Sequence, residues 1–383
     1  MSAVYIHFPY CNSKCLYCNF YSETNLNTQK RFIRALQKEI ELRSGELRKD
    51  TVKTIYFGGG TPSLTPVKDM ALIVEALKRH FKIAAQIEFT VEINPEQATP
   101  DFLRALRKLG VNRISMGVQS FDDRILHFLG RRHTAQQALE GIRHIREAEI
   151  DNISIDLIYG IIIRGGDEWL HDLEVALSQS IQHLSAYALT LEENSILYKE
   201  LVQKNPAAYQ VGKDMDENIA LRDMNLLLQQ IANTPFKRYE ISNFAVPGYE
   251  SKHNSAYWDG TPYLGLGPSA HSFDGATRSW NVSSIETYCK ALESGEGSFE
   301  VEDLSLTDHY NERILLTIRT AKGIDLKKIE EQFGEVYFTH LMNEIALLNK
   351  AWYQIENDHL ILTEEGVALT DHITVQLLYD SIM

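Results

Sequence analysis

The sequence is poor in three features that would each indicate a particular class of protein. Its 383 residues include only 4 cysteines. Its longest apolar runs, such as Ile158–Ile163, are far shorter than the ~20 residues of a membrane-spanning helix. Basic residues are outnumbered, with 38 Lys and Arg against 52 Asp and Glu and a net charge of −14. A disulfide-stabilised secreted scaffold, an integral membrane protein and a non-specific nucleic-acid binder are therefore all disfavoured.

The composition is otherwise that of an ordinary globular protein. Apolar residues make up 44% of the chain and charged residues 23%, so there are enough apolar side chains for a large core. Residues 1–4 show neither a basic n-region nor an apolar h-region, so we expect no secretory signal and a cytoplasmic location. The length predicts one large domain and a smaller one.

The few cysteines are unevenly placed. Cys11, Cys15 and Cys18 lie within eight residues of one another, whereas Cys289 is remote. This pattern predicts a reducing compartment and a local metal or redox site. Cys289 is most simply a buried apolar residue.

The first half of the chain repeats a short strand, a loop and an amphipathic helix. Alternating apolar residues predict strands at 4–8, 52–57, 87–93, 113–119, 153–159 and 183–189. Apolar stripes predict helices between them: Thr65 is expected as an N-cap, and Phe102, Leu106 and Leu109 are expected to face inward. Six successive units of this kind predict parallel strands with right-handed crossovers.

Two architectures fit this pattern, an open doubly wound sheet and an incomplete TIM-type (β/α)6 barrel. A strand covered by helices on both faces is nearly all apolar. Here Glu88, Thr90 and Glu92 alternate with apolar neighbours in one strand, as Ser154 and Asp156 do in another. Such residues need a polar lumen, so the barrel is expected, with its site at the C-terminal ends of the strands.

The rest of the chain predicts two further regions after a barrel at 1–245. Residues 246–300 are rich in Gly, aromatics and His and are expected as a loop-like connecting region. In residues 301–383, helical patterns precede a hairpin that turns at Asn357–Asp358, which is a winged-helix-like α+β outline. This region holds 6 Lys and Arg against 15 Asp and Glu, a net charge of −9. A DNA-binding regulator is therefore disfavoured, and a docking or structural role is expected.

The clustered cysteines have the spacing C-x3-C-x2-C, which leaves two kinds of site to weigh. A structural zinc site normally needs four ligands, so Cys289 or a histidine would have to complete it. A [4Fe–4S] cluster held by Cys11, Cys15 and Cys18 would leave one iron open for a small chelating ligand. We favour the cluster, because this loop follows a strand and is expected at the mouth of the barrel.

The segment Tyr5-Ile-His-Phe-Pro-Tyr-Cys11-Asn-Ser-Lys-Cys15-Leu-Tyr-Cys18 resembles the cluster loop of radical S-adenosylmethionine (radical SAM) proteins. More narrowly, it resembles that of the oxygen-independent coproporphyrinogen III oxidase-like family. The resemblance covers nearly the whole chain. It implies a [4Fe–4S] cluster on the three cysteines, with SAM as the ligand of the open iron.

The same resemblance implies a glycine segment that meets SAM. Gly58, Gly59, Gly60 and Thr61 match the family segment whose glycines bring the backbone to the methionine amino group of SAM. Glycine has no Cβ, so the main chain can approach a ligand closely. Taken alone, a triplet of this kind at a strand end often serves only a turn.

Five residues near strand ends match positions that family members use around SAM: Tyr5, Glu92, Gln119, Arg131 and Asp156. The resemblance implies that Glu92 lies near the methionine and ribose and that Tyr5 lies near the adenosine. It implies a pair between Arg131 and the methionine carboxylate, which suits a guanidinium fork. Gln119 and Asp156 would hydrogen-bond the ribose. Each residue taken singly also has a structural interpretation.

One departure from the family concerns the segment Asp156-Leu-Ile-Tyr-Gly160. Family members usually continue with a loop that contains Pro and Gln, whereas this chain continues Ile161-Ile-Ile-Arg-Gly-Gly166. The sequence leaves the shape of this wall of the pocket open.

Two features separate the branches of the family. In the oxidase the cluster motif typically continues Cys-x-Cys and a longer segment precedes it. Here residue 20 is Phe, and the chain begins only ten residues before Cys11. Both features favour the sister branch of haem chaperones.

The segment His253-Asn254-Ser255-Ala256-Tyr257-Trp258 matches the HNxxYW signature associated with that branch and with haem binding. Neutral imidazole is a common ligand of haem iron, and Tyr257 and Trp258 can stack on a flat macrocycle. Without the resemblance, a structural loop histidine beside two core aromatics is at least as good an interpretation. His271 is a second and weaker candidate.

The sequence thus predicts a haem carrier without oxidase activity, which holds a SAM-ligated [4Fe–4S] cluster and hands haem to an acceptor protein. The alternative is an enzyme that cleaves SAM to a 5′-deoxyadenosyl radical and converts propionates of coproporphyrinogen III to vinyl groups in porphyrin biosynthesis. Neither hypothesis requires nucleic acid or a transmembrane segment. The sequence leaves open the acceptor, covalent haem attachment, SAM cleavage and formation of a homodimer.

Overall fold

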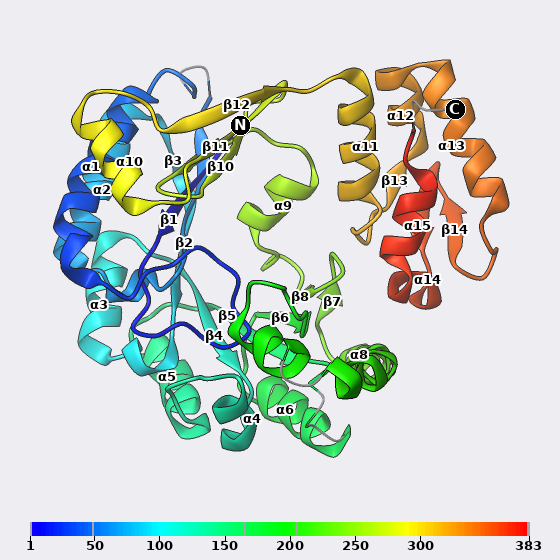
Figure 1. Ribbon diagram of the computed structural model, residues 1–383, viewed down its shortest axis with the longest axis horizontal. Helices are drawn as coiled ribbons and strands as arrows, with labels where there is room; N and C mark the ends of the chain where they lie inside the picture. Colours follow the sequence, from blue (N-terminus) through cyan, green and yellow to red (C-terminus); the bar gives the residue numbers. More distant parts are fainter. Residues whose placement is uncertain (1, 48–49, 162, 164–165, 204–205, 381–383) are drawn as a thin grey trace.

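The computed structural model describes residues 2–47, 50–161, 163, 166–203 and 206–380. Its central feature is a set of six parallel strands that neighbour one another in chain order (Figure 1). These strands are β1 (Ser2–Phe8), β2 (Val52–Gly59), β3 (Ile83–Ile93), β4 (Arg113–Gln119), β5 (Asn152–Tyr159) and β6 (His183–Ala188). The predicted partial (β/α)6 barrel is therefore confirmed.

The convex face of this sheet is covered by the helices that follow the strands (Figure 1). They are α1 (Gln29–Leu42), α2 (Val67–His80), α3 (Pro100–Leu109), α4 (Asp123–Phe128), α5 (Ala135–Glu147) and α6 (Gly166–Ser178), with short 3-10 turns at Leu26–Thr28, Pro62–Leu64 and Pro95–Gln97. Each helix buries one apolar stripe; in α1 the stripe contains Phe32, Leu36 and Ile40. The polar side chains of the strands therefore face the concave side of the sheet.

One detail of the predicted helices is wrong. Thr65 does not cap α2, because its amide closes the preceding 3-10 turn on the carbonyl of Pro62, and Pro66 takes the N-cap position. The predicted inward face of α3 is confirmed: Leu106 is fully buried, and Phe102 and Leu109 pack partly buried against the core. Leu103 is a further buried residue of this face.

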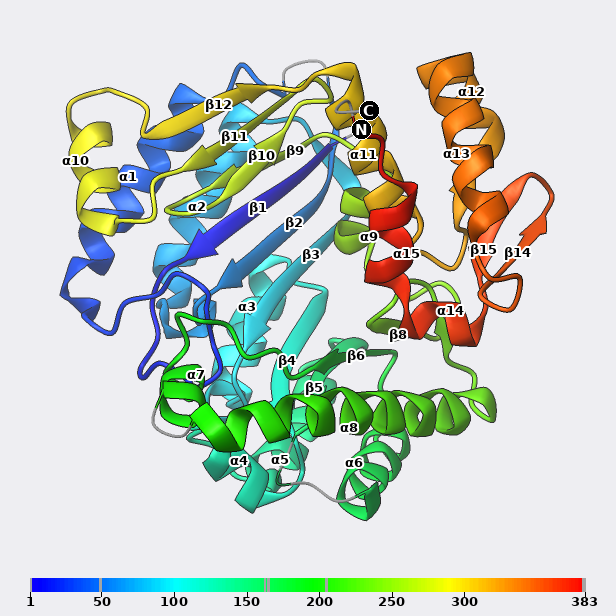
Figure 2. The ribbon, with the colours of Figure 1, turned by 45° about the vertical axis from the view of Figure 1, so that its right-hand side comes forward.

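After β6 the chain forms α7 (Ile196–Tyr198), a π-helical turn (Lys199–Gln203) and the long α8 (Pro206–Ala232). Helix α8 packs beside α6 along one edge of the barrel (Figure 2). Two short antiparallel strands, β7 (Lys237–Arg238) and β8 (Asn243–Ala245), then extend the sheet beyond β6.

Residues 246–300 are more regular than the predicted loop-like region. They form α9 (Lys252–Trp258), β9 (Tyr263–Leu266), β10 (His271–Phe273), β11 (Thr277–Asn281) and α10 (Ile285–Glu293), and β12 (Phe299–Asp303) follows. Strand β9 pairs parallel to β1, and β10–β12 continue the sheet antiparallel, so the sheet has 12 strands within the described residues. These strands have three to five residues, too few to give a clear alternating pattern. The division into 1–245, 246–300 and 301–383 stays a prediction.

Helix α9 lies on the concave side of the sheet, where it contacts β1 and β2 (Figure 1). It also contacts the first helix of the C-terminal domain, α11 (Leu306–Thr317). Helix α9 therefore closes the part of the lumen that lies away from the cysteine loop.

The C-terminal domain has the helix–strand–helix–helix–hairpin order of a winged helix. After α11 come β13 (Ile324–Asp325), α12 (Leu326–Phe333), α13 (Glu335–Leu347), β14 (Tyr353–Glu356), β15 (His359–Leu362), α14 (Glu364–Ala368) and α15 (Thr370–Leu377). The sheet order is β13-β15-β14, all antiparallel. Asn357 and Asp358 both have positive φ, as in a type I′ hairpin turn, which confirms the predicted turn.

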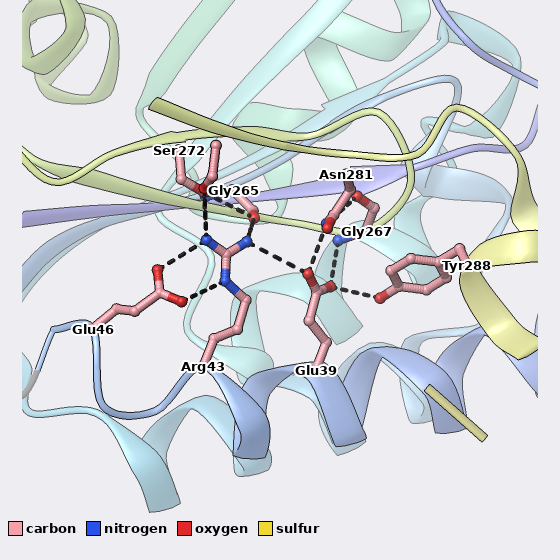
Figure 3. A network of polar contacts seen from close by, with 9 residues as sticks. Glu39, Arg43, Glu46, Gly265, Gly267, Ser272, Asn281 and Tyr288 are labelled. Carbon is pink, nitrogen blue, oxygen red and sulfur yellow. Dashed lines mark hydrogen bonds and ion pairs between the residues drawn. The ribbon is translucent and has the colours of Figure 1, made fainter. Parts of the chain in front are cut away.

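A buried polar network joins α1 to the strands that extend the sheet (Figure 3). The Glu39 carboxylate accepts hydrogen bonds from the Tyr288 hydroxyl at 2.6 Å, the Asn281 amide at 2.6 Å and the Gly267 amide at 2.8 Å. Arg43 lies one turn further along the same helix, 3.7 Å from Glu39. The network fixes the β9–β10 loop, in which a Cβ at Gly267 would lie only 2.5 Å from the His7 carbonyl oxygen.

Within the part of the chain that the structure describes, no helix has both the length and the apolar character needed to cross a bilayer.

Candidate functional site

A cavity of about 600 Å³ opens at the C-terminal ends of the parallel strands. Its walls come from the cysteine loop after β1, the glycine segment after β2 and the lumen-facing residues of β2–β6. The sequence-predicted residues that line it are Cys11, Cys15, Cys18, Gly59, Gly60, Thr61, Glu92, Gln119, Arg131 and Asp156. These residues are thus brought together at the end of the barrel where such sites occur.

The three clustered cysteines are free thiols on the wall of this cavity. The Thr61 hydroxyl donates to the Cys11 sulfur at 3.5 Å, and the Arg131 guanidinium donates to the Cys15 sulfur at 3.4 Å. Burial raises the pKa of the Cys18 thiol. Donors directed at the sulfurs favour thiolates, which are the form that ligates iron.

The donor set fits an iron–sulfur cluster better than a single ion. Among the described residues, no three His, Cys, Asp or Glu side chains converge closely enough to hold one metal ion. Thiolates at the corners of a cubane are further apart than thiolates around one zinc ion. Cys289 cannot complete a zinc site with the loop, because it is buried on α10 within the core. The prediction that Cys289 is a buried apolar residue is confirmed.

The glycine segment after β2 is required by packing within the protein. A Cβ at Gly60 would lie 2.7 Å from the Tyr10 carbonyl oxygen, and Gly59 has φ +105° with the His7 ring directly beside it. Gly58 packs against Tyr56 and does not line the cavity. The close approach of two strands therefore already accounts for these glycines, and their contact with SAM stays a prediction.

Glu92 projects from β3 into the lumen. Its carboxylate accepts hydrogen bonds from the Tyr56 hydroxyl at 2.7 Å and from the Gly59 amide at 3.1 Å. Burial raises the pKa of Glu92 to about 7, and the nearby Asp156 carboxyl adds to the shift. The two hydrogen bonds and the charge of Arg113 oppose it. Glu92 can therefore gain or lose its proton near neutral pH.

Asp156 lies on β5, where its carboxylate accepts a hydrogen bond from the Ser115 hydroxyl at 3.3 Å. Burial raises its pKa to about 6, against hydrogen bonds from Ser185 and Ser115 and the charge of Arg113. Gln119, at the end of β4, has φ +68°, which is costly for a residue other than glycine. Strain of this kind at a cavity wall is typical of a functional residue.

Arg131 crosses from the loop after α4 toward the cysteines. It donates to the Asn94 side chain and to the Gly117 carbonyl, both at 2.7 Å, as well as to Cys15. Its Nε is buried without a hydrogen-bond partner. One donor is thus available for an anion such as a carboxylate.

The predicted haem ligand His253 lies inside the barrel, with 1% of its surface exposed. Its Nδ1 pairs with the Thr54 hydroxyl at 2.8 Å and its Nε2 with the Tyr257 hydroxyl at 2.9 Å. The ring stacks on Tyr56, with centroids 4.9 Å apart. Burial and the charge of Arg113 lower the pKa of His253 to about 3, so the imidazole is neutral. Ligation of iron requires the release of one of its two hydrogen bonds.

Two other predicted residues outside the cavity wall, Tyr5 and Tyr257, lie beside His253. The Tyr5 hydroxyl forms a hydrogen bond of 3.1 Å with Nδ1 of His7, and the Tyr5 ring packs against Tyr56 and His253. Tyr257 contacts His253 edge-on, whereas Trp258 is partly exposed at the end of α9. The structure therefore groups Tyr5, Tyr257 and His253 beneath the cavity and leaves Trp258 apart from them.

Several residues at the site were not predicted from the sequence. Asn254, inside the HNxxYW segment, reaches the cavity, as do Asn94, Tyr56 and Arg113. Glu88 accepts hydrogen bonds from the first backbone amides of α9, 3.0 Å from the amide of His253, and so fixes this helix to β3. The signal for Tyr56 and Arg113 was available, because both fall on the polar, lumen-facing side of their strands.

His271, the weaker haem candidate, is exposed on β10 and lies 6.2 Å from the Trp280 ring, measured between centroids. It does not line the cavity. The unusual loop Ile161–Gly166 falls partly outside the described residues; Ile161 itself is fully buried.

Residues 5–176 match the family model described as Radical SAM superfamily, and residues 304–369 match the HemN C-terminal domain. A protein of Mycobacterium tuberculosis named "Heme chaperone HemW" is 32% identical and is aligned over 98% of this chain and 94% of its own. A protein of the same name from Lactococcus lactis is 30% identical over 100% of this chain and 98% of its own.

Among solved structures, coproporphyrinogen III oxidase (HemN) from Escherichia coli superposes with a TM-score of 0.83. The alignment covers 98% of this chain and 90% of that chain at 20% identity, a similarity that shows the shared fold. With full-length relatives above 30% identity, the chain belongs to the HemW family of radical SAM proteins.

Proposed function

We propose that this protein is a haem chaperone that binds haem, carries a SAM-ligated [4Fe–4S] cluster and transfers haem to an acceptor protein. The observation that carries this proposal is the full-length similarity to proteins named as haem chaperones, at 32% identity over 98% of the chain. The absence of a cysteine at position 20 supports the same branch, since Phe20 stands there. We infer a cytoplasmic location, because the free, clustered cysteines indicate a reducing compartment.

Membership of the radical SAM superfamily implies a [4Fe–4S] cluster and SAM. Cys11, Cys15 and Cys18 would hold the cluster, and when bound it would supply an electron to the sulfonium of SAM. Arg131, through its unpaired Nε, would bind the methionine carboxylate. Glu92 would face the ammonium group, because an ionised carboxylate in a dry lumen favours a cation.

His253 is the proposed ligand of the haem iron. Its imidazole is held neutral by burial, which is the form that binds iron. Two neutral hydroxyl groups occupy its nitrogens, and each such hydrogen bond contributes about 1 kcal/mol. An iron–imidazole bond would replace one of these hydrogen bonds, and the residues that enclose His253 would move aside to admit the iron, because His253 does not line the cavity.

The second candidate function is oxidative decarboxylation of coproporphyrinogen III. The observation that favours it is the likeness of fold to the E. coli oxidase, which covers 98% of this chain. At 20% sequence identity to that oxidase, the similarity supports a shared fold and not a shared activity.

A haem titration separates the two functions. We expect anaerobically reconstituted protein to bind haem with a shifted Soret band, and His253→Ala to lose most of this binding. His271→Ala, the matched change at an exposed histidine, should leave it unchanged. Equal binding by the His253 variant would contradict the assignment of the ligand, and formation of protoporphyrinogen from coproporphyrinogen III would contradict the proposed function.

The cluster proposal has its own test. Cys18→Ala should reduce iron and sulfide in reconstituted protein to background, because two thiolates hold a cubane poorly. Cys289→Ala, a change at the buried core cysteine, should retain the full content. Loss of iron in both variants would contradict the assignment of the three loop cysteines.

A further inference from the structure

Arg113 lies deep in the lumen, at the end of the cavity opposite to its mouth. It begins β4, whose lumen-facing residues continue with Ser115, Gly117 and Gln119 toward the mouth. Only 1% of its surface is exposed, although its side chain lines the cavity. Arg113 is thus a cation that can be reached only through the cavity.

Among the described residues, no carboxylate lies within ion-pair distance of the Arg113 guanidinium, and Glu92 and Asp156 interact with it only at longer range. Its Nε is buried without a hydrogen-bond partner, and no hydrogen bond or ion pair joins its other nitrogens to any residue that the structure describes. A buried charge without a partner is strongly unfavourable, and proteins normally pair such groups. An arginine left unpaired beside a cavity indicates a ligand that supplies the missing anion.

Two further polar atoms at the same level of the barrel also lack partners. Arg113 is in register with Thr90 on β3 and with Asn152 on β5. The Thr90 hydroxyl and the side-chain amide oxygen of Asn152 are both buried and unpaired. Three neighbouring strands therefore each hold one unsatisfied polar atom at this depth, and Arg113 is the one of these three residues that lines the cavity.

The charges around Arg113 restrict the ligand that fits. Its charge opposes the raised pKa values of Glu92 and Asp156 and reinforces the lowered pKa of His253, so all three lie within its electrostatic reach. A doubly charged phosphate would be repelled by two acids that are partly ionised near neutral pH. A single carboxylate matches the guanidinium fork and carries only one charge.

We propose that Arg113 binds a carboxylate that enters the lumen beneath the SAM position, and that this carboxylate is a propionate of the tetrapyrrole carried by the protein. The assignment rests on the proposed haem function and names the side chain that would recognise the acid group of the cargo. His253 would contact the metal, and Arg113 would contact the carboxylate. The two contacts can therefore be removed separately.

The experiment compares four probes on the full-length, cluster-reconstituted protein: haem, haem dimethyl ester, protoporphyrin IX and protoporphyrin IX dimethyl ester. Protoporphyrin has the propionates but no iron, so its binding reports on Arg113 and not on ligation by His253. The variants are Arg113→Gln, Arg113→Lys, and Arg132→Gln as a matched control, since Arg132 is an exposed arginine at the rim of the same cavity. Binding is followed by the Soret band or by porphyrin fluorescence.

We expect Arg113→Gln to weaken protoporphyrin IX binding by roughly ten- to a hundredfold, the range for a hydrogen bond to a charged group. Arg113→Lys should recover part of this loss, and Arg132→Gln should change little. In the wild-type protein the dimethyl esters should bind as weakly as the acids bind to Arg113→Gln. Unchanged melting temperature and iron content would show that the variant is folded.

Several outcomes would overturn the inference. Esters that bind as tightly as acids, or an Arg113→Gln variant with full affinity, would show that no propionate is bound there. A loss of SAM affinity in Arg113→Gln with unchanged porphyrin affinity would assign the carboxylate to SAM. If haem binding depends on His253 but Arg113→Gln leaves porphyrin affinity unchanged, the propionate assignment fails and the proposed haem function stands. If no probe binds, the proposed haem function fails with it.

Discussion

Two arginines of the described part of the chain are almost completely buried, and they differ in their surroundings. Arg43, the C-cap residue of α1, is 2% exposed and Arg113, on β4, is 1% exposed. Arg43 donates to Glu46 at 2.7 and 2.8 Å, to the Gly265 carbonyl at 3.2 Å and to two serine hydroxyls (Figure 3). It also lies over the Phe299 ring. Arg113 has none of these partners among the described residues.

The difference indicates that the charge of Arg43 is structural, whereas that of Arg113 is suited to bind a ligand. Around Arg43 the protein itself supplies every acceptor, and the result is a rigid connection between α1 and the strands β9–β11. Around Arg113 no described residue supplies an acceptor, and its side chain lines the cavity instead. Because proteins normally pair a buried charge, we infer that a ligand in the cavity supplies the missing acceptor. Changes at the two arginines test this contrast directly, and changes at Glu92 and Tyr257 test the ligand-binding side of it; the four are given from the largest expected effect to the smallest.

The largest effect is expected for Arg43→Met. Removal of this guanidinium leaves the buried Glu39 carboxylate without its nearest cation and breaks the contacts to Gly265 and Glu46. We expect a loss of about 3–5 kcal/mol in the free energy of unfolding, measured by urea denaturation. Arg34→Met, a change at an exposed arginine of the same helix, should cost less than about 0.5 kcal/mol. A similar small cost for both variants would contradict the structural role of the network.

The next effect concerns the pH dependence of SAM binding. Because the folded protein holds the Glu92 proton more tightly than the unfolded chain does, the contribution of this proton to stability is complete below pH 4.5 and is lost as pH rises through about 7. A cationic ligand binds the ionised carboxylate, so SAM affinity should rise between pH 6 and 8. Glu92→Gln should weaken binding at pH 8 by roughly ten- to a hundredfold and flatten this dependence. Equilibrium dialysis measures SAM affinity in both proteins across this pH range. If SAM affinity still rises with pH in Glu92→Gln, the titrating group is Asp156 and not Glu92.

A smaller effect is expected for Tyr257→Phe. The Tyr257 hydroxyl competes with iron for Nε2 of His253, and one neutral hydrogen bond contributes about 1 kcal/mol. Haem affinity should therefore rise roughly fivefold in a Soret titration. Tyr263→Phe removes a hydroxyl that contacts Arg278 instead and should have no such effect. Weaker haem binding in Tyr257→Phe would show that this hydroxyl contacts the haem.

The smallest effect is expected for the stability of Arg113→Met. Because Arg113 has no internal partner, its loss removes a desolvated charge and breaks no ion pair. The free energy of unfolding should change by less than about 1 kcal/mol, and an increase is favoured. A loss as large as that of Arg43→Met would show that Arg113 is a structural residue and would remove the contrast between the two arginines.

Much of the fold and of the cavity wall could be predicted from the sequence. Strands such as β3 carry the alternation of a polar lumen face, and the cysteine spacing is local in the chain, so both are visible without coordinates. The short strands β9–β11 could not be predicted in this way. They are held by pairing with distant segments, β9 with β1, and their few residues show no period of their own.

The roles of individual buried residues were less predictable. His253 has the same sequence signature whether it lies on the surface or inside the barrel, and only the packing of α9 against β1 and β2 decides between the two. The alternation along its strand assigns Arg113 to the lumen face, but no local pattern shows that it lacks a partner there. Its significance depends on partners that are missing in three dimensions.

The sequence by itself determined the partial barrel, the three cysteines at its mouth and the acidic winged-helix-like domain, because periodicity and spacing are local properties of the chain. Tertiary structure alone decided that the glycine segment is required by strand packing, that His253 is enclosed with both nitrogens paired, and that Arg113 is buried without an anion. Hydrogen-bond satisfaction depends on groups from different strands that meet in the lumen, and no local pattern records it.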